Sequence, residues 1–304
     1  MSPDDIKLYD LVQPADVTAL TRELDCLLGE MAPGLDLGPL HQAVEDTVRL
    51  YRGQYPGYRA ANTKYHDLEH ALAATLAFLR LAHGAFCLGD GLPAATLHLA
   101  VTAALFHDAG LIQTLADTEG TGAKYTIGHE LRSMAFVSYY LSQRGYRGED
   151  IENCAHVIAA TILGRSLKDI PFRDEAARRA GQMMGAADLL AQMADRMYLE
   201  KVLLLYQEFE EARLPGFSSE LDLLRQTEGF YEFQAKKRLD GDLGGVQRFL
   251  RPHFKHRWGV ERDLYQDSVE RNLDYLRSIL HECEASYREH LRRGGIVDNL
   301  ANGV

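Results

Sequence analysis

The sequence predicts an all-α fold with roughly ten or more helices packed on one another. Apolar residues recur at helical spacing along nearly the whole chain, as in helices that bury one face. Segments rich in glycine and proline interrupt this period, and no β-rich run, internal repeat or low-complexity tract is evident. The 304 residues, 46% hydrophobic and 25% charged, suit one large soluble domain or two small ones.

In the first third of the chain, breaks in the pattern separate the expected helices. The breaks are Pro33-Gly34, the turn at 53–57 and the loop at 84–93. Pro93 suits the first turn of a helix, and Gly110 suits its end. The helices expected here span residues 17–30, 40–51, 66–82 and 93–107.

The rest of the chain is also expected to be helical. A polar loop at 117–124 is followed by helices at about 128–143, 149–162, 174–181 and 183–213. A break at 214–219 precedes a helical stretch at 220–291 that is interrupted near Arg251-Pro252. We therefore expect N-terminal helices at 1–58 that pack on a core domain at 59–291, and a flexible tail at 292–304.

Bulk composition narrows the class of protein. The net charge of −11 argues against a surface that coats nucleic acid, because phosphate binding needs a concentrated basic face. The four cysteines form no CxxC pair, so neither a disulfide framework nor a thiolate zinc site is expected. Residues 1–10 lack an apolar signal core, and no run reaches the ~20 apolar residues of a membrane span. These features predict a cytoplasmic protein without a membrane partner.

The His107-Asp108 pair is the most unusual feature, because it ends the apolar run 97–106. Buried ionisable groups need a partner or a metal. The favourable helix dipole could account for a C-terminal histidine but not for the aspartate. Imidazole plus carboxylate suits Zn, Mn or Fe, and a bridging carboxylate suits Mg or Mn at a second position.

Other histidines and acids could complete such a site. His66 and His70, four residues apart, are expected on one helix face, although they could equally be partly exposed residues near a helix start. Asp188 lies in a small, apolar segment, where it is either a ligand or an N-cap. His129 could be a ligand or a capping residue, and His156 is more typical of a core histidine.

Taken in order, these segments resemble the HD superfamily of metal-dependent phosphohydrolases, which are all-helical and hold one or two metals between helices. Within it, the order is most similar to class I cyclic nucleotide phosphodiesterases. The similar segments are Tyr65-His66-Asp67-Leu68-Glu69-His70, Ala103–Asp108, Val157–Ile162, Ala187-Asp188, Gln226–Phe230 and Asn272–Tyr275.

The resemblance implies a role for each matching residue. His70, His107, Asp108 and Asp188 would bind a first divalent metal (Zn, Mn, Mg or Fe), and Asp108 would bridge to a second. A hydroxide formed at the metals would attack phosphorus, and His66 would then protonate the leaving oxygen. An acid such as Glu130, or another acid nearby, would orient His66. Gln226 and Phe230 would hold the base of a nucleotide or another small phosphorylated substrate.

This chain also departs from that pattern. Asp67 replaces an asparagine, Ile162 an aspartate, and Leu111 a second histidine; one extra residue follows Gln226. His129 matches a position where the related HD-GYP phosphodiesterases place a second-metal histidine. One alternative is a di-iron oxygenase on the same scaffold, although it needs more ligands than the spare residues His129 and His156 supply. The other is a degenerate nucleotide sensor. The long C-terminal helices could pair in a homodimer.

Overall fold

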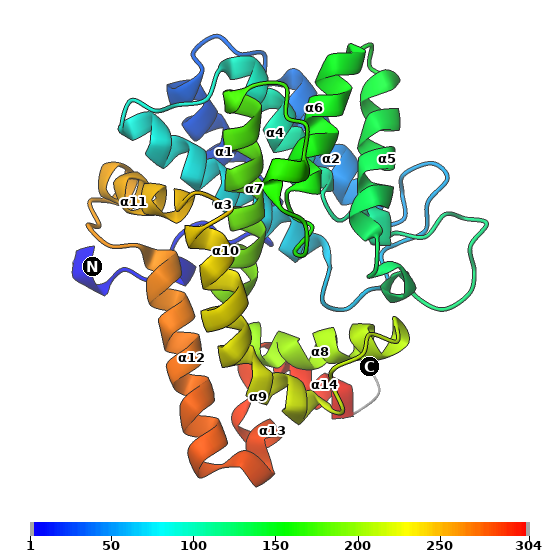
Figure 1. The fold of residues 1–304 in the computed structure, drawn as a ribbon, viewed down its shortest axis with the longest axis vertical. Coiled ribbons are helices and arrows are strands. Elements are labelled where there is room, and N and C mark those ends of the chain that lie inside the picture. Colours follow the sequence, from blue (N-terminus) through cyan, green and yellow to red (C-terminus); the bar gives the residue numbers. More distant parts are fainter. Residues whose placement is uncertain (1–2, 302–304) are drawn as a thin grey trace.

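The computed structural model describes residues 3–301, and these form one all-helical domain (Figure 1). No strand is present in that range; only two isolated bridges occur, Arg52–Ala60 and Tyr58–Thr114. The helices are α1 (Val17–Met31), α2 (Gly38–Tyr51), α3 (Leu68–Cys87), α4 (Ala94–Phe106), α5 (His129–Ser142), α6 (Gly148–Ala159), α7 (Glu175–Met193), α8 (Tyr198–Glu211), α9 (Glu220–Phe230), α10 (Lys236–Asp240), α11 (Leu250–Trp258), α12 (Leu264–Glu282), α13 (Tyr287–His290) and α14 (Ile296–Ala301). Short 3-10 turns connect several of them, including η3 (Ala109–Leu111) and η7 (Val246–Phe249).

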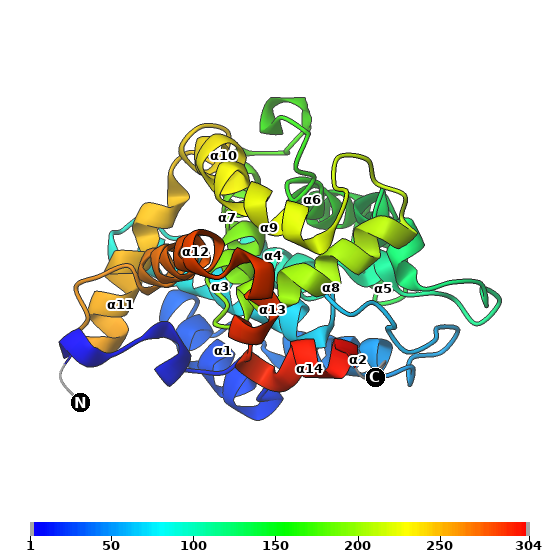
Figure 2. The ribbon, with the colours of Figure 1, turned by 90° about the horizontal axis from the view of Figure 1, so that it is seen from below.

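Helices α3 and α7 form the centre of the domain and pack against each other (Figure 1). Helices α4, α5 and α6 lie to one side, while α1 and α11 pack on α3 from the other. Helices α8, α9, α12, α13 and α14 lie in the lower part of Figure 1, and Figure 2 shows this group from below. Side chains that reach the space between α3, α4, α5 and α7 therefore come from segments far apart in the sequence.

Several helix boundaries differ from the expectation. The expected break at residue 182 is absent, because Gly181 and Gly185 serve as close-packing positions within α7. A Cβ at Gly181 would lie 2.6 Å from the ring of Phe172, and one at Gly185 would lie 2.7 Å from the carbonyl oxygen of Ala160. The break comes instead at 194–197, where the Asp195 carboxylate accepts from the Met197 amide at 2.8 Å.

The C-terminal third differs in a similar way. The break expected at Pro252 is wrong, because this proline lies in the first turn of α11, where a missing amide hydrogen costs nothing. The chain bends earlier, at Gly244 and Gly245, both with positive φ. Residues 292–301 of the expected tail include α14, which packs against α8 with Val297 6% exposed. Residues 302–304 lie outside the described part of the chain.

Helix α3 is long and apolar enough, by length and composition alone, to cross a membrane. Within the domain, however, 83% of its most apolar window is buried. Burial by the surrounding helices accounts for this apolar composition, as in the core helix of a large helical domain.

Candidate metal centre

The start of α3 places the first two histidines. Asp67 is the N-cap of this helix, and its Oδ1 accepts from the His70 amide at 2.8 Å. His66 consequently lies in the turn before the helix, so the expectation that His66 and His70 share a helix face is wrong. Their rings are nevertheless neighbours, with centroids 5.7 Å apart. Asp67 thus has a capping role at the position where the phosphodiesterase pattern has asparagine.

The end of α4 places the His-Asp pair. The helix ends at Phe106, and the backbone tightens into η3 after Asp108, so the two side chains turn toward one another. His107 Nδ1 donates to the Ala104 carbonyl at 2.8 Å. This bond fixes the proton on Nδ1 and leaves the Nε2 lone pair facing Asp108 Oδ2 at 3.3 Å.

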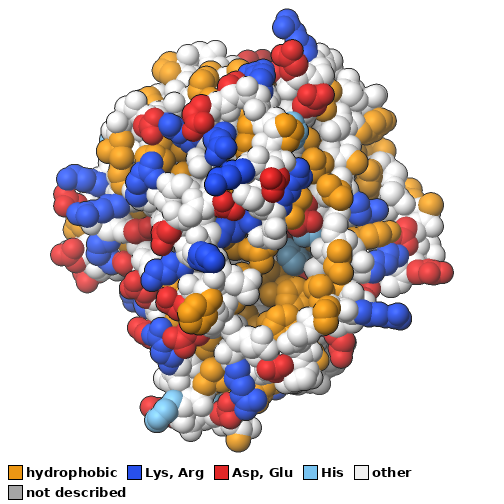
Figure 3. All heavy atoms as spheres, viewed as in Figure 1, with side chains coloured by type: hydrophobic (Ala, Val, Ile, Leu, Met, Phe, Trp, Pro, Cys, Tyr) orange, Lys and Arg blue, Asp and Glu red, His pale blue; other side chains and the backbone are white. Residues whose placement is uncertain are grey.

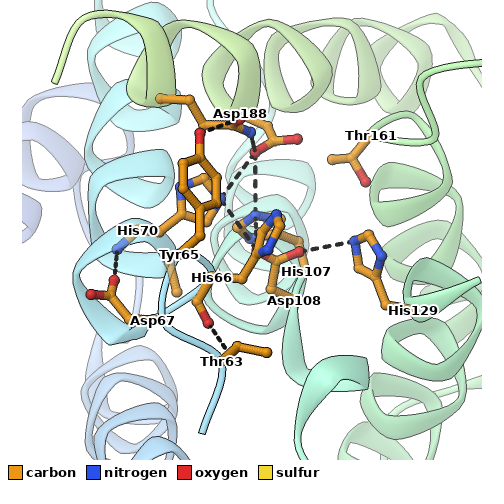
Figure 4. A network of polar contacts seen from close by, with 12 residues as sticks. Thr63, Tyr65, His66, Asp67, His70, His107, Asp108, His129, Thr161 and Asp188 are labelled. Atoms are coloured by element: carbon orange, nitrogen blue, oxygen red, sulfur yellow. Dashed lines mark hydrogen bonds and ion pairs between the residues drawn. The ribbon is translucent and has the colours of Figure 1, made fainter. Parts of the chain in front are cut away.

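Four side chains converge on one point between α3, α4 and α7 (Figure 4). His70 Nε2 lies 3.2 Å from both Asp108 Oδ2 and Asp188 Oδ1, and His107 Nε2 lies 3.6 Å from Asp188 Oδ1. Ligands ~2.1 Å from a common metal are separated by ~3.0 Å in octahedral and ~3.4 Å in tetrahedral geometry. The observed separations of 3.2–3.6 Å therefore match the edges of one coordination shell.

Three of these ligand atoms have no hydrogen-bond partner despite being buried. They are His70 Nε2, His107 Nε2 and Asp108 Oδ2, and all three face the common point. Burying a polar atom without a partner costs free energy of folding. A bound ion would give all three atoms a partner. The donor set, two imidazoles and two carboxylates, suits Zn²⁺, Mn²⁺ or Fe²⁺. The residues present therefore fit a divalent metal.

The electrostatics of the cluster lead to the same conclusion. Burial by itself would lower the pKa of His70, but the carboxylates of Asp108 and Asp188, each 3.2 Å from its Nε2, raise it to about 10. Burial likewise opposes ionisation of Asp108, yet the neighbouring histidines hold its pKa well below the usual range. Without a metal, the lone pairs of the histidine nitrogens would face the negatively charged carboxylate oxygens, so protons must bind between them. A divalent cation can replace those protons.

Asp108 also contacts a fifth ligand candidate with its other oxygen. His129 Nε2 lies 3.2 Å from Asp108 Oδ1, while its Nδ1 donates to the Thr126 carbonyl at 2.8 Å. Gly110 permits this approach, because a Cβ there would lie 2.0 Å from the His129 carbonyl oxygen. The two oxygens of Asp108 thus face two different sets of ligands, the arrangement that a carboxylate bridging two metals requires.

Asp188 is held by a chain of side chains. It lies within α7, so the alternative of an N-cap is excluded. Gln192 Nε2 donates to Asp188 Oδ1 at 2.9 Å, and the Tyr65 hydroxyl donates to Gln192 Oε1 at 2.9 Å. Tyr65 therefore orients a ligand through Gln192, a role that the sequence motif alone did not assign to it.

A cavity of about 660 Å³ opens onto the cluster. His66, Asp108, His129 and Asp188 lie at its polar end, and residues of α8 and α9 form a largely apolar wall. Figure 3 shows the corresponding hollow, with histidine surface at its floor and hydrophobic side chains below it. Glu130, Thr161, Gln226 and Phe230 also line it.

The two residues expected to hold a base lie on the α9 side of this cavity. Phe230 presents a half-buried ring. Gln226 is exposed, and its Nε2 donates to the Gly216 carbonyl and to Asp222 Oδ1, both at 3.1 Å. The amide nitrogen of Gln226 is thus engaged within the protein. Ile162 follows Thr161, and it is Thr161 that faces the cavity.

Residues 57–237 match the Npun_R2479-like family, which is more than half of the chain. The chain belongs to this family. No curated protein matches the sequence. The matched region contains all five metal-ligand candidates, His66 and the whole cavity wall, whereas α1 and α11 lie outside it.

In this Npun_R2479-like protein, the carboxylate partner of His66 is Glu208, which the sequence did not indicate. Glu208 Oε2 lies 2.6 Å from His66 Nδ1, and Glu208 Oε1 accepts from the Tyr65 amide at 2.7 Å. Of the two alternatives expected for this partner, Glu130 is wrong, because its carboxylate lies 3.6 Å from His129 Nδ1, and the other, a different acid nearby, is confirmed by Glu208. Glu208 belongs to α8 and is 142 residues from His66, so only the tertiary fold brings them together.

His156 does not belong to the centre. Its ring lies beside Phe172, with centroids 6.3 Å apart, and it is not among the residues that line the cavity. Of the two spare histidines, His129 is therefore the one that lies beside the cluster.

Proposed function

We propose that the protein is a metal-dependent phosphohydrolase that cleaves a small phosphodiester, a cyclic or linear nucleotide being one candidate class. The observation that carries this proposal is the convergence of His70, His107, Asp108 and Asp188, with unpartnered ligand atoms, beside a histidine–carboxylate pair. Such a pair at the edge of a cavity is the arrangement of a general acid.

A divalent metal bound to these ligands would lower the pKa of a water molecule and offset charge on the phosphoryl oxygens. The protein's own residues supply the remaining functions. Asp108 divides its two oxygens between the His70–His107 side and the His129 side. His66 holds its Nδ1 proton against Glu208, and its imidazole lines the cavity, where it can donate a proton from Nε2 to a leaving oxygen.

The charge of the cavity lining favours a phosphodiester over a phosphomonoester. Among the described residues that line it, none is lysine or arginine, while Glu130, Asp108 and Asp188 are acidic. Apart from the histidines, only a bound metal could therefore neutralise phosphate charge. A phosphodiester carries one negative charge and a monoester nearly two at pH 7. The apolar wall suits an aromatic or apolar substituent on such a diester.

The direct test compares two chromogenic substrates, bis(p-nitrophenyl) phosphate and p-nitrophenyl phosphate, with the metal-free protein supplemented by Mn²⁺, Zn²⁺ or Mg²⁺. We expect metal-dependent hydrolysis of the diester in preference to the monoester. A panel of cyclic and linear nucleotides then defines the class. Tight nucleotide binding without turnover would contradict the proposal and indicate a sensor. Two bound irons with oxygen consumption and no hydrolysis would indicate the oxygenase.

Two variants separate the proposed roles. Asp108→Ala is expected to lose metal and activity together, because it removes ligand atoms on both sides of the cluster. His66→Ala is expected to retain metal and lose turnover by about 10²- to 10⁴-fold, the typical cost of losing a general acid. His281→Ala, an exposed histidine on α12, is the matched control for a histidine removed away from the centre.

A further inference from the structure

A second cluster of metal-binding side chains lies at the opposite end of α3. His83 and Cys87 are one helical turn apart, and they face Glu30 of α1 and His256 of α11. Their ligand atoms lie close together: those of His83, Cys87 and His256 are all within 4.8 Å of one another. His83 Nε2 and His256 Nε2 each lie 3.2 Å from Glu30 Oε2.

The separations that involve His83 are close to the edges of a tetrahedral zinc shell, and Glu30 joins the three-residue group through its contacts with the two histidines. With Zn–N and Zn–O of ~2.1 Å and Zn–S of ~2.3 Å, tetrahedral ligand atoms are separated by ~3.4–3.6 Å. The two nitrogen–oxygen separations are 3.2 Å, and Cys87 Sγ lies 3.9 Å from His83 Nε2. One thiolate, two imidazoles and one carboxylate complete four-coordination from the protein alone, as in a structural zinc site.

The charges of these ligands also suit a dication. Glu30 supplies a carboxylate, and Cys87 would lose its thiol proton when the metal binds. Two anionic ligands would then balance the two charges of Zn²⁺.

A neighbouring histidine provides support behind the cluster. His253 Nδ1 lies 3.1 Å from His83 Nδ1. If His83 binds a metal through Nε2, its Nδ1 carries the proton and donates a hydrogen bond to His253 Nδ1. Metal-bound histidines commonly donate their second ring N–H in this way.

We propose that Glu30, His83, Cys87 and His256 bind a zinc ion that fastens α11 to α1 and α3. The helix rise of 1.5 Å places His70 and His83 about 20 Å apart along α3, so this site is separate from the proposed active centre. At Gly84 the backbones of α3 and η7 are in direct contact, since a Cβ there would lie 1.7 Å from the Phe249 carbonyl oxygen. Zinc would secure α11, which follows η7 directly, at this contact.

Hydrogen bonds offer the competing explanation. Glu30 Oε2 could accept from an Nε2–H on each of His83 and His256, with no metal present. In that arrangement Cys87 Sγ, which lies 3.5 Å from His83 Nδ1, forms a weak thiol–imidazole hydrogen bond, so only the state of the thiol separates the two explanations. The thiolate therefore provides the decisive readout, and the ligands proposed for the other centre include no cysteine.

The experiment titrates the metal-free full-length protein with Co²⁺ and follows the near-ultraviolet charge-transfer band of a cobalt–thiolate bond. We expect a band whose intensity saturates when one Co²⁺ is bound at this site per protein molecule. The band should be absent in Cys87→Ser, and it should disappear when Zn²⁺ displaces the Co²⁺. His256→Ala should weaken Co²⁺ binding at least tenfold. Cys283→Ser and His281→Ala, both on or beside α12, are the matched controls and should keep the band.

The outcomes are distinct from those of the activity test. Absence of the band at saturating Co²⁺, or its persistence in Cys87→Ser, would overturn the proposal and leave a hydrogen-bonded network only. Circular dichroism of Cys87→Ser verifies that the variant is folded, and serine changes only one atom. Hydrolysis of the phosphodiester depends on the other centre, so either proposal can fail while the other holds.

Discussion

Replacing Glu208 by glutamine tests whether this residue supports His66 in proton transfer. Glutamine has nearly the same shape, so it changes charge and hydrogen bonding while filling the same space on α8. The native carboxylate uses both oxygens: Oε2 faces His66 Nδ1 at 2.6 Å, and Oε1 accepts from the backbone amides of Tyr65 and His66 at 2.7 and 3.3 Å.

Neither orientation of the glutamine amide satisfies these partners. With its NH₂ toward His66 Nδ1, the amide opposes the Nδ1 proton that a charged imidazolium carries. With its oxygen toward Nδ1, the NH₂ faces two backbone donors. A hydrogen bond to a charged group contributes about 1.5–3 kcal/mol. Since ~1.36 kcal/mol corresponds to a tenfold change in rate, kcat should fall about 10- to 150-fold.

Steady-state hydrolysis of bis(p-nitrophenyl) phosphate at saturating Mn²⁺ measures the effect. We expect a loss in kcat with KM changed less than about threefold and metal content unchanged, because Glu208 does not contact the metal ligands. Glu210→Gln, an exposed acid on the same helix, is the control. An unchanged kcat for Glu208→Gln, or an equal loss in both variants, would refute the role of Glu208 as a positioning residue.

Three further predictions concern protons, packing and stability. Burial would lower the pKa values of His70 and His129, but their contacts with Asp108 raise these values to about 10 and about 9. The metal-free protein therefore holds both protons at pH 7. Metal binding should release at least one proton and tighten as pH rises toward 9, and calorimetry in two buffers of different ionisation enthalpy would count it; zero release would contradict the ligand set. Gly110→Ala should destabilise the fold by about 1–3 kcal/mol, measured by thermal unfolding, and should weaken the His129 side of the centre first, because its Cβ would meet the α5 backbone. Burial raises the pKa of Asp263 from 3.8 to about 6, so the protonated carboxyl contributes stability below pH 4, and this contribution is lost as pH rises through 6. Asp263→Asn keeps the α12 N-cap without the ionisable group. Its free energy of unfolding, measured with urea, should exceed that of the wild type by up to about 3 kcal/mol at pH 7 but not at pH 4.

The candidate metal ligands could be predicted from the sequence because they are ionisable residues in apolar surroundings. Asp108 follows a run of apolar residues, and Asp188 lies in a segment of small apolar ones, so both demanded a partner. The structure brings both to His70 and His107, and it places His129 on the second oxygen of Asp108. Local residue chemistry was sufficient for this part of the site.

Long-range partners and glycine roles were not accessible in the same way. Glu208 resembles any other acid in the α8 sequence, and only the packing of α8 against the start of α3 makes it the partner of His66. Gly181 reads as a helix breaker, yet it permits close contact with Phe172 inside α7. The all-α fold followed from helical periodicity, whereas exact boundaries depended on contacts that a single sequence does not encode locally.

We propose that His70, His107, Asp108 and Asp188 form a metal centre that acts on phosphodiesters. The decisive measurement is metal content by elemental analysis, together with diester hydrolysis, on the same preparations of Cys87→Ser and of Cys87→Ser/Asp108→Ala, because Cys87→Ser removes the other proposed site. Cys87→Ser should retain at least one divalent ion and hydrolyse the diester, and the double variant should lose both. Stoichiometric metal and undiminished hydrolysis in the double variant would contradict the proposal.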